Sequence, residues 1–286
     1  MPAFDRQEHT NANIPQSATV GYLLVGHGTR DAFGVAQFLK VHQQMAGLMP
    51  KSITACGFLE LAEPDISQAV ATLAERGVTH LITIPLLLFT AGHAERDIPA
   101  AVAQAASRHG LVCLHQVAAF ECTPSILSLS ALRFRQAVCD SADFSHDTCA
   151  ATSTCLGSHC GRVGLVMIGR GSSSAEATRR MRQFVEMRLR MTPVAWSQTA
   201  FIHAQKPSVT EALDELQSCR LPVAVVQPHL LFSGELLNQL REEAARRQIL
   251  NPGQKWLITA PLGSDESLAA MLAERAQVVG LGVCGD

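Results

Sequence analysis

Two histidines and one glutamate, His27, Glu60 and His93, are the residues whose types and spacing favour chemistry. Glu60 lies 33 residues after His27, and His93 lies 33 residues after Glu60. Two neutral imidazoles and a carboxylate bind a divalent first-row metal ion and leave coordination positions open. The same groups accept protons. This trio therefore predicts a site that binds a metal ion and passes it on, whereas a closed four-ligand site would hold the ion as structure.

Each member of the trio follows a short apolar segment that is typical of a β-strand. The segments 20–26, 53–59 and 80–89 end at or shortly before one member, and a fourth strand is expected at 111–118. Strands that alternate with helices predict a parallel sheet with helices on both faces. Such sheets bind ligands at the carboxyl ends of their strands. We therefore expect the trio to converge on one crevice.

The segments between these strands carry helical patterns. Apolar residues recur at helical spacing in the first of them, at Phe38, Val41, Met45 and Leu48. Asp65 with Gln68, and Ser208 with Glu211, have the spacing of a capping box, in which two side chains satisfy backbone N–H groups at a helix start. Both pairs predict the first residues of a helix.

The second half of the chain repeats the first at an offset of 143 residues. Three segments match at this offset: VGYLLVGHGTR with VGLVMIGRGSS, GFLELAEPDISQAVATL with AFIHAQKPSVTEALDEL, and PLLLFTAG with PHLLFSGE. We therefore expect two similar α/β domains, at 18–138 and 163–286. A Cys- and Ser-rich linker is expected at 139–162.

The second half keeps the scaffold and loses the trio. Other residues stand at its positions: Arg170 for His27, His203 for Glu60, and Glu235 or Leu236 for His93. The first half is therefore predicted to hold the metal site, and the second half to be a degenerate repeat. A secondary metal site at His203 and His229 stays open as an alternative, although it lacks a third ligand.

The segments VGHGTRD, GFLELAEPDI and PLLLFTAGHAERDIP resemble the three sequence blocks of class II chelatases of the CbiX/SirB type, in their two-domain form. The resemblance implies insertion of Co²⁺ or Fe²⁺ into sirohydrochlorin, in cobalamin or siroheme biosynthesis. It also implies that His27 and His93 bind the metal ion and accept the pyrrole protons, with Glu60 assisting. The metal ion is then a substrate, and no organic cofactor is expected. Residue types do not distinguish cobalt from iron.

The implied tetrapyrrole carries many carboxylates, so its site requires cations. Arg30 and Arg96 lie within three residues of His27 and His93 and are candidate carboxylate partners. Solvated loop arginines are the alternative interpretation for both. Arg170 is a third candidate, which would face the cleft from the second half. That half could equally be only a lid or a structural partner.

The linker at 139–162 contains Cys149, Cys155, His159 and Cys160. Their spacings match no common metal-binding motif. A loop that tolerates cysteine is the preferred interpretation, and a bound metal ion or iron–sulfur cluster is the alternative.

Composition argues against several other classes of protein. The chain has 23 lysine and arginine residues against 25 aspartate and glutamate residues, which gives no reason to expect nucleic acid or an anionic membrane as partner. The N-terminal segment lacks the apolar centre of a signal peptide, and the most apolar segment, 81–89, is too short to cross a bilayer. The nine cysteines then indicate reduced thiols in a cytoplasmic protein.

One rival function uses the same trio without a tetrapyrrole. A metal-binding or metal-delivery protein would bind the ion through His27, Glu60 and His93 and show no affinity for a macrocycle. A cleft between two repeats fits a chelatase better than it fits a carrier. Two repeats in one chain also favour a monomer, because they can replace a dimer of single repeats.

Overall fold

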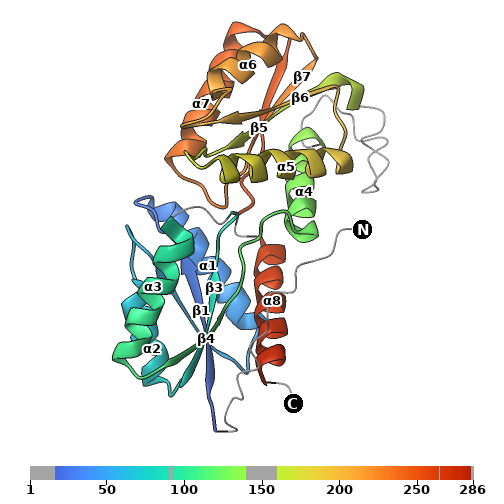
Figure 1. Ribbon diagram of the computed structural model, residues 1–286. Coiled ribbons are helices and arrows are strands. Elements are labelled where there is room, and N and C mark those ends of the chain that lie inside the picture. The colour runs from blue at the N-terminus through green and yellow to red at the C-terminus, as the bar shows by residue number, and fades with distance from the viewer. Residues whose placement is uncertain (1–16, 90–92, 140–159, 264, 285–286) are drawn as a thin grey trace.

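The computed structural model describes residues 17–89, 93–139, 160–263 and 265–284 (Figure 1). Most of the predicted linker, with Cys149, Cys155 and His159, lies outside the described residues. So do the side chains of His93 and Cys160. Among the described helices, none is both long and apolar enough to cross a membrane.

Two four-stranded parallel sheets form the framework, as the α/β interpretation predicted. The first has the order β2-β1-β3-β4, from β1 (Val20–Gly26), β2 (Ile53–Phe58), β3 (His80–Pro85) and β4 (Val112–Gln116). The second has the order β6-β5-β7-β8, from β5 (Val163–Gly169), β6 (Trp196–Phe201), β7 (Val223–Pro228) and β8 (Lys255–Ile258). The equal strand orders show that the repeat extends to topology.

Strand β3 ends at Pro85, four residues earlier than the apolar run to Phe89 predicted. The backbone N–H of Leu86 still donates to the carbonyl of Val25 on β1, at 2.8 Å. The next residue, Leu87, instead accepts a hydrogen bond from Phe120, at 3.0 Å. Residues 86–89 are therefore apolar because they lie between packed elements, and not because they extend the strand.

Eight α-helices and one short 3₁₀ helix (Cys160–Arg162) accompany the strands in the described part of the chain. The α-helices are α1 (Ala32–Leu48), α2 (Ile66–Glu75), α3 (His93–Arg108), α4 (Pro124–Cys139), α5 (Ala175–Met191), α6 (Val209–Ser218), α7 (Glu235–Leu250) and α8 (Glu266–Cys284). Both predicted capping boxes are present, at the starts of α2 and α6. The starts of α3 and α7 place Glu235 at the position of His93.

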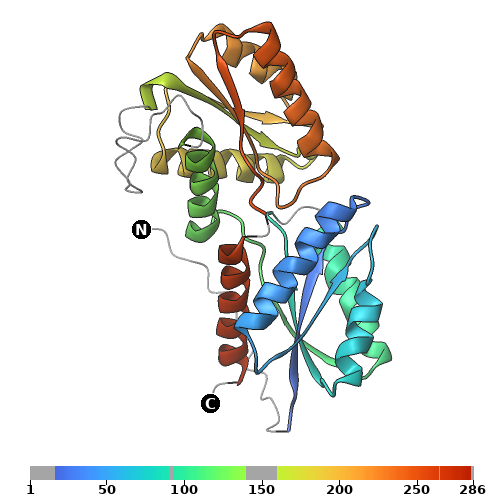
Figure 2. The same ribbon diagram turned by 180° about the vertical axis from the view of Figure 1, so that it is seen from behind.

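The last helix of each half packs on the sheet of the other half (Figures 1 and 2). Helix α8 packs against α1 and β3, and α4 packs against α5, β7 and β8. The predicted ranges 18–138 and 163–286 describe the repeat along the chain. Each packed unit, in contrast, combines one half with the last helix of the other. We call the unit around β1–β4 the first unit and the unit around β5–β8 the second unit.

Two arginines at equivalent positions hold the segments where the chain crosses between units. Arg133 on α4 donates to the carbonyls of Pro261 and Leu262, at 3.0 and 2.9 Å. Arg275 on α8 donates to the carbonyls of Ala118 and Ala119, at 2.7 and 3.1 Å. Helix α4 therefore holds the segment that leads to α8, and α8 holds the segment that leads to α4.

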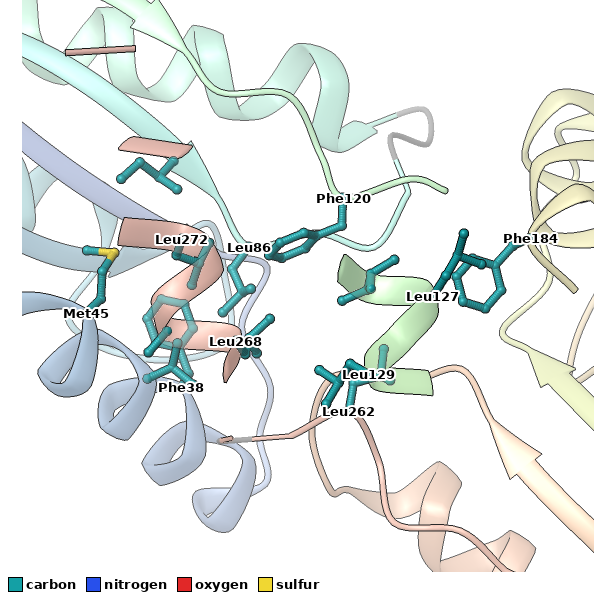
Figure 3. Packing of buried hydrophobic residues seen from close by; sticks show 14 of the residues in the cluster. Phe38, Met45, Leu86, Phe120, Leu127, Leu129, Phe184, Leu262, Leu268 and Leu272 are labelled. Carbon is teal, nitrogen blue, oxygen red and sulfur yellow. The ribbon is translucent and has the colours of Figure 1, made fainter. Parts of the chain in front are cut away.

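One apolar core runs through both units because the exchanged helices carry it across (Figure 3). On the first unit Leu268 and Leu272 of α8 pack with Phe38 and Met45 of α1 in this cluster. The opposite face of the first sheet is covered by α2 and α3, and that of the second sheet by α6 and α7. Burying one such leucine contributes about 1.5–3 kcal/mol. The relative position of the two units is thus set by core packing.

Candidate functional site

His27 and Glu60 follow the neighbouring strands β1 and β2, and the structure brings them together. The backbone N–H of Glu60 donates to the carbonyl of His27 at 3.0 Å, which continues the strand pairing by one residue. The side chains also meet, with 3.4 Å between His27 Nδ1 and Glu60 Oε1. They are 40% and 55% exposed, so a metal ion can reach both from solvent.

Gly28 fixes the turn that presents His27. Its φ of 99° lies in the left-handed region, and a Cβ at this position would overlap the carbonyl oxygen of Glu60. Only glycine allows the two strand ends to approach this closely. The contact between the His27 imidazole and the Glu60 carboxylate therefore depends on the left-handed backbone conformation that glycine adopts at position 28.

His93 is the first residue of α3. Helix α3 follows β3, and β3 pairs with β1 on the side opposite to β2. The three strands that lead to the trio are therefore neighbours, as expected. The position of the His93 side chain lies outside the described residues, so its part in the trio stays a prediction.

His27 and Glu60 line a cavity of about 450 Å³ between the two units. The second half contributes Arg170, after β5, and residues 230–237, after β7. The carboxyl ends of both sheets thus face one cleft. Ligand sites are commonly concave and mostly apolar, with a few polar groups, and this cavity combines phenylalanine and leucine side chains with the His27–Glu60 pair.

The three candidate arginines differ in their relation to this cleft. Arg170 lines the cavity together with His27. Arg30 and Arg96 are exposed, and neither belongs to the described residues that line it. The structure therefore brings one of the three arginines to the cavity of His27 and Glu60.

The contribution of residues 230–237 to this wall was not foreseen. The backbone N–H of Ser233 donates to Gln37 Oε1 on α1 at 2.8 Å, and the rings of Phe232 and Phe38 lie 6.3 Å apart, edge to face. The match between PLLLFTAG and PHLLFSGE marked this segment as part of the repeat. It could not show that the segment reaches across to the other unit.

A larger hollow, of about 730 Å³, lies on the second unit where α6 and α7 end. It is away from the carboxyl ends of the strands, and no histidine or cysteine is among the described residues that line it. Among the described residues, no three His, Cys, Asp or Glu side chains gather closely enough to hold a metal ion. The alternative pair, exposed His203 and buried His229, gains no third ligand among the described residues.

Fold and site together define a two-domain α/β protein with an open imidazole–carboxylate pair in the cleft between its domains. The CbiX family model matches residues 21–137 and again residues 164–279. The chain belongs to the CbiX family.

Relatives with assigned names span most of the chain. A sirohydrochlorin ferrochelatase from Priestia megaterium is 25% identical over 257 residues, which cover 90% of this chain and 89% of the relative. A sirohydrochlorin cobaltochelatase from the same organism is 23% identical, covering 89% of this chain and 78% of the relative. The structure of SirB from Bacillus subtilis with Fe³⁺ matches with a TM-score of 0.69 at 24% identity, over 91% of this chain and 94% of that chain.

Proposed function

We propose that this protein is a sirohydrochlorin chelatase, which inserts Co²⁺ or Fe²⁺ into the macrocycle. The observation that carries the proposal is the His27–Glu60 contact of 3.4 Å at the cleft, in a chain that matches the CbiX family model in both halves. The relatives named above are chelatases of sirohydrochlorin and span the same two-domain length. The metal ion is a substrate of this reaction.

We infer a role for each member of the pair from this geometry. Glu60 Oε1, 3.4 Å from His27 Nδ1, favours the tautomer with the proton on Nδ1, which leaves Nε2 to bind the metal ion or accept a proton. Insertion exchanges two pyrrole N–H protons for one divalent ion, so two protons must leave the macrocycle. His27 and Glu60 are partly exposed and can pass protons on to solvent.

His93 is proposed as the second metal-binding histidine, because α3 begins after the strand beside β1. Arg170 is proposed to bind a substrate carboxylate within the cleft that it lines. Arg30 and Arg96 are exposed, so they would meet only carboxylates that extend out of the cleft.

The choice between cobalt and iron stays open, since relatives of both kinds match over most of the chain at similar identity. The prediction of a monomer is supported by the exchange of α4 and α8, because each unit already completes the other. Light scattering on the purified protein tests it, and a stable dimer would contradict it. The cytoplasmic location stays a prediction.

The test is metallation of sirohydrochlorin without oxygen, with Co²⁺ or Fe²⁺, followed by the visible spectrum. We expect fast insertion by the wild type and a loss of about 10²–10⁴-fold in His27→Ala and in His93→Ala, because a positioned proton acceptor contributes about that much. His203→Ala is the matched control. It removes an exposed histidine at the position of Glu60 in the second half and should leave the rate unchanged.

Two results would overturn the proposal. A wild-type rate equal to the uncatalysed rate, with tight Co²⁺ binding, would make the protein a metal-delivery protein. Equal losses in His203→Ala and His27→Ala would move the chemistry away from the first half.

A further inference from the structure

A second cavity, of about 360 Å³, adjoins the first on the side of the second unit. Five residues line both cavities: His27, Leu87, Leu88, Arg170 and Leu230. Further walls of the second cavity come from the end of β5, the first turns of α5 and Phe89. A ligand in the cleft can therefore extend from one cavity into the other.

The second cavity is the counterpart of the first under the repeat. Residues at equivalent positions line the two cavities: Gly26 and Gly169, His27 and Arg170, Gly28 and Gly171, Thr29 and Ser172, Phe38 and Met181, Phe58 and Phe201. Phe89 reaches the ring of Phe184 in the second unit at 6.2 Å, as Phe232 reaches Phe38 in the first at 6.3 Å. The second half has thus kept a ligand-sized space and changed the groups around it.

His229 is the change in chemistry that stands out: its ring packs against those of Phe184 and Phe89, with centroids 4.1 and 5.1 Å away, and this contact makes no use of its ring nitrogens. His229 lines the second cavity, is 5% exposed, and stands at the position of Leu86, which is 2% exposed. Neither of its ring nitrogens has a hydrogen-bond partner in the described part of the chain, and both are covered, so a ligand in the cavity reaches them only after a neighbouring side chain moves. A buried polar group without a partner costs about 1–3 kcal/mol. Because leucine fills the same place in the first unit, the fold does not require a histidine there.

The surroundings of His229 favour an anion. Burial lowers its pKa to about 3, so the imidazole is neutral near pH 7 and keeps one N–H to donate. Arg170 supplies a cation, and the positive end of α5, capped by Ser174, begins beside the cavity. No aspartate or glutamate is among the described residues that line it.

We propose that this second cavity is a carboxylate subsite, in which His229 and Arg170 hold a carboxylate arm of the tetrapyrrole while the macrocycle faces His27. The inference rests on the proposed function and extends it to the second half. His229 is then a substrate-positioning residue, and its unpartnered nitrogen acquires its partner when the substrate binds. A free small carboxylic acid offers the same chemistry, and the experiment separates the two sources.

The first arm of the test measures binding of metal-free sirohydrochlorin by fluorescence. We expect His229→Leu to weaken binding about tenfold, which is the effect of losing one hydrogen bond to a charged group. His229→Gln keeps an N–H donor and should stay within about threefold of the wild type. Affinity for Co²⁺ alone should not change in either variant. The control His109→Leu removes an exposed histidine after α3 and should bind as the wild type does.

A purely structural role predicts a different pattern. His229→Leu should then change the unfolding temperature and not the dissociation constant. We expect instead a weaker affinity for the macrocycle together with an unfolding temperature at or above that of the wild type. The fold should tolerate the change because leucine occupies the equivalent place in the first unit. Equal dissociation constants for the wild type and His229→Leu would overturn the subsite and leave the chelatase proposal standing.

The second arm titrates acetate and propionate against protein with ¹⁵N-labelled histidine, and follows the ring signals of His229 by NMR. Macrocycle binding that depends on His229, with no response to the free acids, assigns the subsite to the tetrapyrrole. Where the wild type binds no macrocycle, the proposed function fails. The subsite then stands only if the free acids shift the His229 signals, and it falls with the function if they do not.

Discussion

The two halves of this chain share a backbone and differ in chemistry. Gly28 and Gly171 both have positive φ, at 99° and 85°, and a Cβ at either would overlap a carbonyl of the neighbouring strand end. The residues that follow β1 and β5 are nevertheless His27 and Arg170. The comparison teaches that the scaffold depends on glycine, caps and apolar strands, whereas a few strand-end side chains can change without altering it.

The halves also differ in how each unit receives its exchanged helix. On the first unit Met45 of α1 is buried in the apolar cluster that contains α8. On the second unit the equivalent residue is Arg188, fully buried, whose guanidinium lies 4.7 Å from the ring of Phe134 on α4 and donates to Gln227. Burial, together with nearby Arg135, lowers the pKa of Arg188 to about 9.

That buried network ties α4 to the second unit, since Gln227 in turn donates to the carbonyl and hydroxyl of Ser130 on α4, at 2.7 and 3.2 Å. Helix α8 meets α1 in the first unit through an apolar cluster, in which Met45 takes the place of Arg188. Buried polar groups that pair with only one candidate neighbour favour a single arrangement over its alternatives. We interpret this asymmetry as the feature that directs each helix to its own sheet.

The largest effect is expected from removing α8. A chain that ends at Gly263 uncovers the face of the first sheet on which Leu268 and Leu272 are buried. Each lost core leucine costs about 2–5 kcal/mol, against a total stability of about 5–15 kcal/mol for a domain. We expect hydrogen exchange to show lost protection in β1–β3, although the His27–Glu60 half is intact in sequence. Strands β5–β7, still covered by α4, serve as the internal control, and retained protection in β1–β3 would contradict the helix exchange.

Alanine substitutions of the two glycines with positive φ, Gly28 and Gly171, should separate effects on folding from effects on metal binding. Gly28→Ala and Gly171→Ala both force a Cβ onto a carbonyl, so urea unfolding should show similar losses, of about 1–3 kcal/mol or more. Co²⁺ titration of the folded proteins should show lost affinity in Gly28→Ala alone. Gly77→Ala is the control, because its φ is also positive, at 82°, and no atom lies within 4 Å of the added Cβ. Equal loss of Co²⁺ binding in both strained variants would place metal binding outside the first half.

The smallest effect concerns the caps of α2 and α6. The ammonium of Lys206 and the N–H and hydroxyl of Ser208 donate to Glu211 and lower its pKa to about 2 from 4.5. This carboxylate stabilises the fold above about pH 4.5, and its contribution is lost as the pH falls towards 2. In α2 the same place is taken by Gln68, which does not titrate.

We therefore expect Glu211→Gln to lower the unfolding temperature slightly at pH 6 and not at all near pH 2. The thermal unfolding of both proteins, followed by circular dichroism across this range, measures the difference. Gln68→Ala, the matched variant in α2, should show a loss that does not depend on pH. A pH-independent difference for Glu211→Gln would mean that its charge contributes nothing to the cap.

Local features of the fold could be predicted because local rules produce them. Strand and helix periods, the capping boxes at Asp65 and Ser208, and the repeat itself depend on neighbours within a few residues or on direct comparison of segments. The predictions are wrong where tertiary packing decides which apolar residue is buried. Leu48 fits the apolar face of α1 but is exposed, and Met49, just beyond the helix, is buried instead.

The sequence by itself determined the fold class, the two repeats and the strand ends that carry His27 and Glu60. Only the tertiary structure decided which sheet α4 and α8 cover, because the two helices occupy equivalent places in the repeat and no local pattern distinguishes their partners. It also placed Arg170 with His27 on one cavity, and it buried His229 with no hydrogen-bond partner among the described residues. These placements depend on how the two units pack against each other. Such packing arises from contacts between residues far apart in the sequence, which residue spacing does not reveal.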